Sequence, residues 1–227
     1  MVGWITQFLA FVLGSGVVAA LTQSFFDNRR TAKSKREAVS YLALRLAYLL
    51  EGYAIDCASK EADHDTAIEH EGDAGSFLAE VPVLPDLPTS DAYQLLDTKT
   101  LGQILDLPQR REMAQQAAMF WWDMVADEGA TRVALGENTI TMGFLALKIA
   151  KDLRSSYHLG SRDLTFGRWD IVQHYEKEMR KVAAAEAHRE KMEAEGAAAA
   201  ERDLAVITGQ LSPSDDNHRS LATTPES

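Results

Sequence analysis

The chain has 227 residues, a formal net charge of −11 and a single cysteine. This acidic balance argues against a general nucleic-acid-binding module, because such modules gather Lys and Arg on one surface. One thiol cannot form a disulfide within the chain, so a disulfide-stabilised fold is also excluded.

The first 26 residues contain no charged side chain. Residues 4–26 include eleven Leu, Ile, Phe or Val, and about 20 mostly apolar residues suffice to cross a hydrocarbon core. We therefore predict a transmembrane anchor at 1–26, in contact with the lipid bilayer. Two alternatives remain open: a signal peptide cleaved near Ala20, and a buried helix of a soluble oligomer. The lack of Lys or Arg before the apolar stretch disfavours the signal peptide.

Residues 27–37 form a basic juxtamembrane segment with five cationic and two acidic side chains. Cations that directly follow a span favour the cytoplasmic side, which predicts a single-pass protein of the cell inner membrane with its N-terminus outside. Lys and Arg next to a membrane also attract anionic lipid head groups. The residues predicted to make these head-group contacts are Arg29, Arg30, Lys33, Lys35 and Arg36.

Residues 38–209 are predicted to form a cytoplasmic helical domain. An apolar seam recurs at three- and four-residue steps near its start, which indicates a helix continuing from the anchor. The seam has two interpretations: packing onto later helices of the same chain, or a coiled coil with a second copy. Its members are Val39, Leu42, Leu46, Leu49, Tyr53 and Cys57.

Residues 63–90 interrupt the helical pattern with Gly72, Gly75 and three prolines. The stretch "PVLPDLP" favours an extended connector, and we expect Val83, Leu84 and Leu87 to lie across the bundle. Short helices should follow, capped by Ser90 or Asp91 and by Asp97 or Thr98, the second ending near Pro108.

The next helical region is predicted to run from Pro108 to Gly136. Its expected buried face consists of Met113, Ala117, Phe120, Trp121, Met124 and Val125. We expect Asn138 to cap another helix whose buried face includes Ile140, Phe144, Leu145, Ile149 and Leu153. A final helix should start between 165 and 168, with Ile171, Val172, Tyr175, Met179 and Val182 inward, and residues 210–227 read as a disordered tail.

These elements predict an all-α fold: one N-terminal transmembrane helix that continues into a cytoplasmic bundle of about four main helices. The long stretch at 181–209 is rich in Ala and alternating charges, so it offers few large side chains to a core. It is a candidate for solvent exposure or for contact with a partner.

One stretch, "EADHDTAIEHEGD", carries metal-ligand chemistry. Asp63, His64, Glu69 and His70 are the candidate ligands, because imidazole and carboxylate groups bind zinc, manganese and iron. On a helix, however, His64 and His70 point about 120° apart. We therefore expect a solvated helix end without a metal or other cofactor, and we keep a membrane-tethered metal-dependent enzyme as the alternative function.

The sequence contains no recognisable catalytic motif. Cys57 lies on the apolar seam, which predicts a core thiol rather than a nucleophile. Trp122 should point away from its aromatic neighbours, so it forms either a second packing surface of the core or a candidate protein interface. We therefore expect a protein that acts through contact with an unknown protein partner at the cytoplasmic face, with a homodimer as one form of this contact and with no nucleic acid bound.

Overall fold

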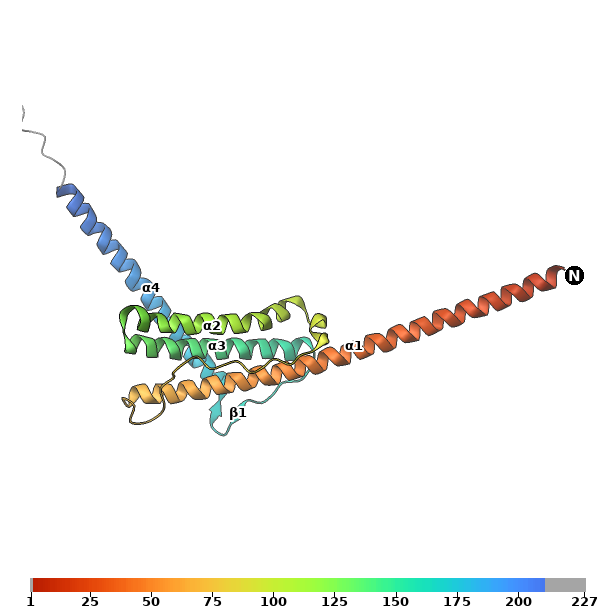
Figure 1. Cartoon of the computed structure of the whole chain (residues 1–227), viewed down its shortest axis with the longest axis horizontal. Helices are drawn as coiled ribbons and strands as arrows, with labels where there is room; N and C mark the ends of the chain where they lie inside the picture. The colour runs from red at the N-terminus through yellow and green to blue at the C-terminus, as the bar shows by residue number, and fades with distance from the viewer. Residues whose placement is uncertain (1, 211–227) are drawn as a thin grey trace, which may run out of the picture. The chain divides into compact units, whose positions relative to one another are not determined.

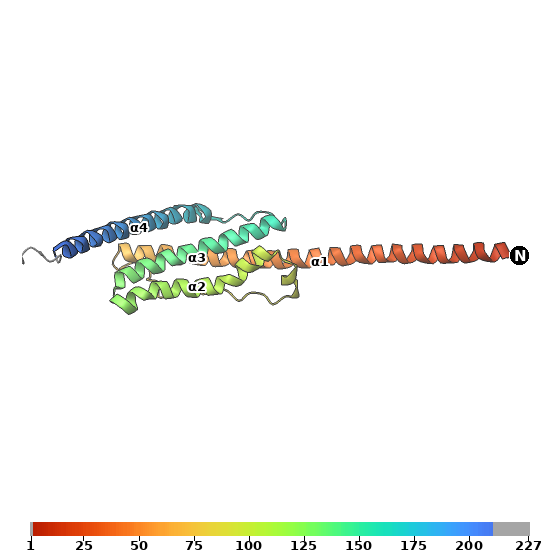
Figure 2. The ribbon, with the colours of Figure 1, turned by 90° about the horizontal axis from the view of Figure 1, so that it is seen from above.

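The computed structural model describes residues 2–210, with side chains described for residues 23, 26 and 28–204 except 125. Its regular secondary structure is helical, as predicted, apart from one strand pair in the described residues (Figures 1 and 2). The elements are α1 (Val2–Glu69), the 3₁₀ helix η1 (Asp91–Leu95), α2 (Thr98–Val125), α3 (Glu128–Ser156), β1 (Thr165–Phe166), β2 (Trp169–Asp170) and α4 (Ile171–Gln210).

The helix α1 joins two regions that the sequence treats as different. It runs without a break from Val2, through the basic segment and into the bundle. Described side chains from 28 to 38 are exposed, and Val39 is the first of the described side chains that is buried. The predicted anchor at 1–26 falls almost wholly on side chains outside the described set, as does the predicted tail at 210–227.

The apolar seam of α1 packs onto the chain's own helices. Leu46, Tyr53 and Cys57 are buried in the common core, where α1 lies beside α3 (Figure 1). Internal packing therefore uses the seam, and the alternative of a self-associating coiled coil along it has no free surface in the described residues.

Residues 70–90 form a strap tied to α1 and α2, which is shorter than the connector predicted at 63–90 because α1 continues to Glu69. Val81 is fully buried, its N–H donates to Gln115 Oε1, and its carbonyl accepts from Arg111 at 2.6 Å. The Tyr53 hydroxyl donates to the carbonyl of Pro82 at 3.0 Å. The connector was predicted to lie across the bundle, and it does, but Val83 points to solvent because Val81 takes the buried position.

The predicted break at Pro108 is wrong, because α2 continues through it. Proline removes one helical hydrogen bond, but Ile104 and Leu107 are fully buried, and their packing offsets that cost of about 3 kcal/mol. The real break comes at Ala126, whose φ of 53° is left-handed, and Asp127 then caps α3 by accepting from the N–H of Ala130.

Gly136 and Asn138 lie inside α3 and do not end or cap a helix. Gly136 allows α1 to approach, since a Cβ there would lie 3.3 Å from Cδ2 of His64. The Asn138 amide donates to the carbonyl of Ala114 at 2.8 Å, which joins α3 to α2. Both residues make contacts between helices. In the sequence alone, a glycine resembles a helix stop and an asparagine resembles a helix cap.

The predicted buried face of α2 is inverted. Ala114 and Ala118 face the core, whereas the large side chains predicted to be buried are exposed. Small residues let α2 and α3 approach closely, so the apolar bulk is left on the outer side of the helix. We call this exposed set the outer stripe: Met113, Ala117, Phe120, Trp121 and Met124.

The helix α4 begins at Ile171, after the short β1–β2 ladder, rather than between 165 and 168. Ile171 and Tyr175 are fully buried, but Val172 is exposed, contrary to prediction. The Tyr175 hydroxyl donates to the carbonyl of Ala54 at 2.6 Å, which holds the first turns of α4 against α1. Residues 180–204 belong to a second compact unit and are mostly exposed.

Two described segments are long and apolar enough to cross a membrane by length and composition, Asn28–Glu69 and Glu128–Ser156. Half of the most apolar window of each is buried inside the bundle, which is also expected of a core helix. The predicted anchor at 1–26 lies N-terminal to both segments.

Candidate functional site

His64 is a buried link between three segments. The Leu78 N–H donates to Nδ1 at 3.0 Å, so the ring hydrogen lies on Nε2, which donates to the carbonyl of Arg132 at 2.8 Å. The Phe77 ring packs edge-on against the imidazole. Both ring nitrogens are therefore engaged with backbone groups, and neither is free to bind a metal ion.

We expect His64→Phe to lower the free energy of unfolding by about 1–3 kcal/mol, because it leaves the partly buried N–H of Leu78 and carbonyl of Arg132 without their partner. Denaturant unfolding of the full chain in detergent measures this change. The matched variant His70→Phe alters an exposed ring and should change stability by less than about 0.5 kcal/mol. Equal effects of the two variants would contradict a structural role for His64.

The other predicted metal ligands do not converge on His64. Asp63, Glu69 and His70 are exposed around the end of α1, and the backbone of His70 has already left the helix. His64 itself is fully buried, so the predicted solvated helix end is wrong at this position.

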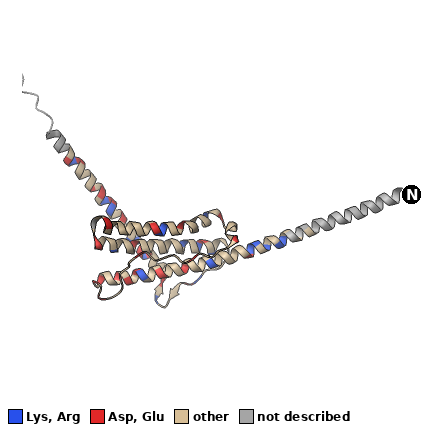
Figure 3. Cartoon of the chain, in the orientation of Figure 1, with Lys and Arg blue, Asp and Glu red and all other residues tan. Residues whose placement is uncertain are grey.

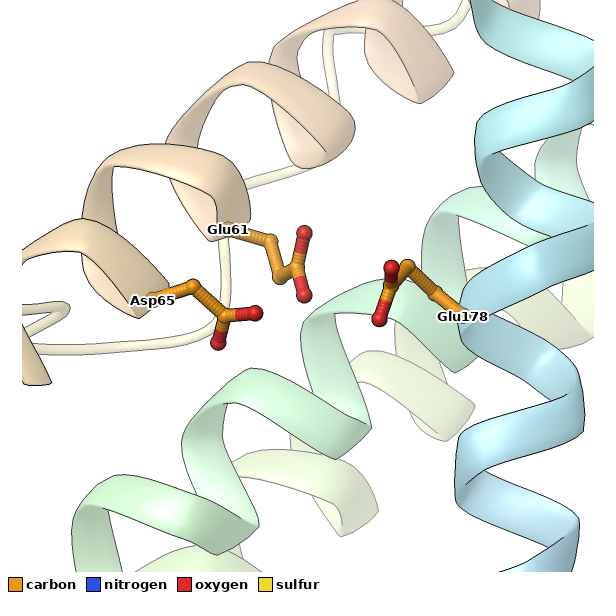
Figure 4. Close-up of side chains that lie close together, drawn as sticks. All are labelled: Glu61, Asp65 and Glu178. Carbon is orange, nitrogen blue, oxygen red and sulfur yellow. The ribbon is translucent and has the colours of Figure 1, made fainter. Parts of the chain in front are cut away.

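Three other carboxylates come together between α1 and α4. Ligand atoms of Glu61, Asp65 and Glu178 lie within 4.8 Å of one another, and their side chains point toward a common space (Figure 4). His174 Nε2 lies 3.2 Å from Glu61 Oε2, although without hydrogen-bond geometry, and Lys177 Nζ lies 3.3 Å from Glu178 Oε1. Lys177 is exposed and offsets only part of the acidic charge of these three carboxylates.

The predicted lipid-contacting residues lie on the exposed stretch of α1 before the bundle. Arg29, Arg30, Lys33, Lys35 and Arg36 are all exposed, and Figure 3 shows Lys and Arg gathered along this stretch. Lys33 makes an ion pair with Glu37 at 3.8 Å. The exposure of all five cations is compatible with the predicted contact with anionic head groups.

Trp122, the predicted interface residue, is half exposed. It follows Ala118 by one helical turn, so it continues the core-facing side of α2 beyond the point where that side is covered. The outer stripe lies on the opposite side, where the rings of Phe120 and Trp121 meet edge to face at 5.8 Å. The end of α2 therefore exposes apolar side chains on two faces.

A groove of about 740 Å³ lies between the last turns of α3, the following loop and the first turns of α4. Its apolar walls include Phe144, Leu147, Leu164 and Tyr175. Its charged lining consists of Lys148, Lys151, Arg154, Arg162, Glu51 and Glu176, so cations exceed carboxylates by two. No sequence pattern predicted this groove, because its lining residues come from three separate segments of the chain.

Glu51 forms the charged floor of the groove. It is 3% exposed, and its Oε2 accepts from both Arg154 and Arg162 at 3.0 Å. Hydrogen bonds from Arg154 to Glu51 raise the pKa of Arg154 above its ordinary value. The two guanidinium groups share one carboxylate, which leaves an excess positive charge at a largely buried place.

Cys57 is buried between α1 and its neighbours, as predicted for a core thiol. Burial raises the pKa of the thiol to about 12, so the reactive thiolate is scarce at neutral pH. We found no basic group placed to activate it among its described hydrogen-bond and ion-pair partners. Its position indicates packing rather than catalysis.

We expect iodoacetamide at pH 8 to leave Cys57 unmodified in the folded chain and to modify it fully after denaturation. Intact mass before and after reaction measures the change. The matched variant Ser59→Cys places a second thiol on the exposed side of the same helix turn, so one thiol should react when folded and two when unfolded. Rapid modification of Cys57 in the folded chain would contradict its burial.

No protein-family model matches the chain, and neither a curated protein nor a solved structure resembles it significantly. Function is therefore inferred from the residues of this chain alone.

Proposed function

We propose that this protein is a single-pass membrane protein whose helical bundle binds another protein at the cytoplasmic face of the membrane. Residues 1–26 serve as the anchor, and the basic segment at 27–37 keeps the bundle on the inner side. The observation that carries the binding function is the outer stripe of α2, which exposes large apolar side chains on a chain that is otherwise strongly acidic.

The outer stripe has the spacing of a helix-binding surface. Met113, Phe120 and Met124 lie seven and four residues apart, so they occupy one side of α2. Phe120 is 51% exposed and Met124 is 69% exposed, whereas large apolar groups on a stable surface are usually scattered. Aromatic and Met side chains are enriched at the centres of protein interfaces, which favours the apolar face of a partner helix as the occupant.

The position of the stripe favours a protein over the anchoring membrane. The contact of His64 with Arg132 places the α2–α3 junction beside the far end of α1. His64 lies 38 residues after Phe26, which is about 57 Å of straight helix. The bilayer that holds residues 1–26 would therefore not reach the stripe on an upright α1.

Site-specific photo-crosslinking in native membranes tests this proposal. A photoreactive phenylalanine analogue at Phe120 should yield an adduct heavier than the chain, whereas the same analogue at exposed Gln173 on α4 should not. The adduct mass separates a homodimer from a different protein partner.

A disrupting variant supplies the second arm. Met124→Asp should abolish the adduct formed at Phe120, while Leu105→Asp, which alters an exposed side chain of α2 outside the stripe, should leave it unchanged. Absence of any protein adduct at Phe120 in membranes, or an adduct that survives Met124→Asp, would overturn the proposal.

The alternative function, a metal-dependent enzyme built around His64 and His70, receives no support from the geometry. Both nitrogens of His64 bind backbone groups, and His70 lies beyond the end of α1.

A further inference from the structure

The groove between α3, the 157–164 loop and α4 combines an apolar wall with a cationic lining. Phe144 and Leu147 of α3 and Tyr175 of α4 supply an apolar wall. Cationic side chains line the same cavity, although the whole chain carries a net charge of −11. A volume of about 740 Å³ is in the range that holds a drug-sized organic molecule.

Several of the cationic side chains that line the groove have hydrogen-bond donors without a partner among the described residues. Lys148 and Lys151, one helical turn apart on α3, make no ion pair or hydrogen bond within the described part of the chain. Arg162 donates from Nη1 to Glu51 and its guanidinium lies 4.7 Å from the centroid of the Tyr48 ring, but its other donors make no hydrogen bond to a described group. Three cationic side chains can therefore turn donors toward a ligand in the groove.

The floor supplies a further electrostatic reason for an anion. Arg154 and Arg162 share the single carboxylate of Glu51, and the Arg154 side chain is only 10% exposed. A positive charge that is mostly removed from water costs free energy unless an anion compensates it. Guanidinium groups match the paired oxygens of phosphate and carboxylate groups.

We propose that this groove binds an anionic amphiphile, a molecule with one phosphate or carboxylate head and an alkyl chain. The head contacts Lys148, Lys151 and Arg162, and the chain lies along Phe144, Leu147 and Tyr175. This site is separate from the outer stripe on α2, and it adds a small-molecule ligand to the proposed protein-binding function.

The position of the groove limits how the ligand arrives. Glu51 lies 25 residues after Phe26, about 38 Å further along a straight α1. A lipid still seated in the anchoring bilayer does not span that distance, so the ligand is a monomeric amphiphile that has left the membrane or never entered it.

Calorimetric titration of the full chain in phosphatidylcholine nanodiscs tests the proposal, with heats from empty nanodiscs subtracted. Dodecyl phosphate is the main probe, and butyl phosphate and inorganic phosphate test whether the alkyl chain matters. Dodecyltrimethylammonium tests the sign of the charge. We expect saturable binding of dodecyl phosphate, at least tenfold weaker binding of butyl phosphate, and no binding of the cationic probe.

Two variants locate the site. Lys148→Glu combined with Lys151→Glu changes exposed side chains and should weaken dodecyl phosphate binding at least tenfold, whereas Lys99→Glu, an exposed lysine of α2, should leave it unchanged. Val172→Trp fills the groove from an exposed position and should weaken dodecyl phosphate more than inorganic phosphate.

Each result of these titrations supports or overturns the proposed binding of an anionic amphiphile. Equal binding of dodecyl phosphate by the double lysine variant and by Lys99→Glu would overturn the proposal, as would binding of the cationic probe with similar affinity. Binding of inorganic phosphate as tight as that of dodecyl phosphate would remove the amphiphile and leave only an anion site. Circular dichroism of each variant confirms that its helix content is unchanged.

Discussion

Gly143→Ala is expected to destabilise the bundle by about 2–4 kcal/mol, although it adds a single methyl group. A Cβ at Gly143 would overlap the Tyr175 hydroxyl and lie 2.7 Å from the Cβ of Cys57. These groups belong to α4 and α1, so the methyl group would separate three helices at once. It would also displace Tyr175 from its hydrogen bond to the carbonyl of Ala54.

Gly102→Ala is the matched control for this prediction. Gly102 lies inside α2, is exposed, and has no neighbouring atom within 4 Å of an added Cβ. Ala is favoured over Gly in a helix interior, so this change should raise stability by about 0.5–1 kcal/mol. Denaturant unfolding of the full chain in detergent measures both variants. Similar effects of the two substitutions would mean that α1, α3 and α4 do not meet at Gly143.

Stability should fall steeply above pH 10. Burial raises the pKa values of Tyr53 and Tyr175 above their ordinary value and that of Cys57 to about 12. The folded chain keeps these protons at a pH where the unfolded chain releases them. The stabilisation is therefore complete below the ordinary pKa values and is lost as the pH rises through the folded ones.

The size of this loss of stability follows from the number of buried groups that keep their protons in the folded chain. Each one contributes a slope of up to about 1.4 kcal/mol per pH unit, so the three together approach about 4 kcal/mol per unit near pH 11, where the unfolded chain has released nearly all three protons. Denaturant unfolding at several pH values between 8 and 11.5 measures the slope. Tyr175→Phe removes one group and should reduce the slope by about a third. A slope that Tyr175→Phe leaves unchanged would show that other groups control alkaline unfolding.

The sequence predicted the helical fold and much of the core. Regular spacing identified the buried seam of α1 and the buried side of α3 because large apolar residues carry both. Ser90 and Asp97 cap η1 and α2 as their side-chain chemistry predicts. Apolar spacing and capping chemistry predicted the structure correctly wherever it depends on residues close together in the sequence.

The sequence-based predictions were wrong where a segment distant in the chain determines which side of a helix is buried. Apolar spacing selects the large side chains of α2, but α3 packs against Ala114 and Ala118, so Phe120 and Met124 face solvent. Gly136 resembles a helix stop, yet its role is to admit His64. Neither fact can be read from α2 or α3 alone.

The candidate groove could not be predicted for the same reason. Glu51 lies 103 residues before Arg154 and 111 residues before Arg162. One signal was present, since Glu51 follows Leu49 and Leu50 on a strongly apolar helix. A buried acidic residue requires a cationic partner, but only the fold identifies which arginines supply it.

The proposed function requires that residues 1–26 act as a permanent anchor and that the bundle lies on the cytoplasmic side. Fusion of alkaline phosphatase and, separately, green fluorescent protein to the C-terminus in a bacterial host measures this topology directly. We expect a fluorescent fusion that resists carbonate extraction from membranes and a phosphatase fusion without activity. An active phosphatase fusion, or release of the intact chain by carbonate, would contradict the anchor and the proposed site of action.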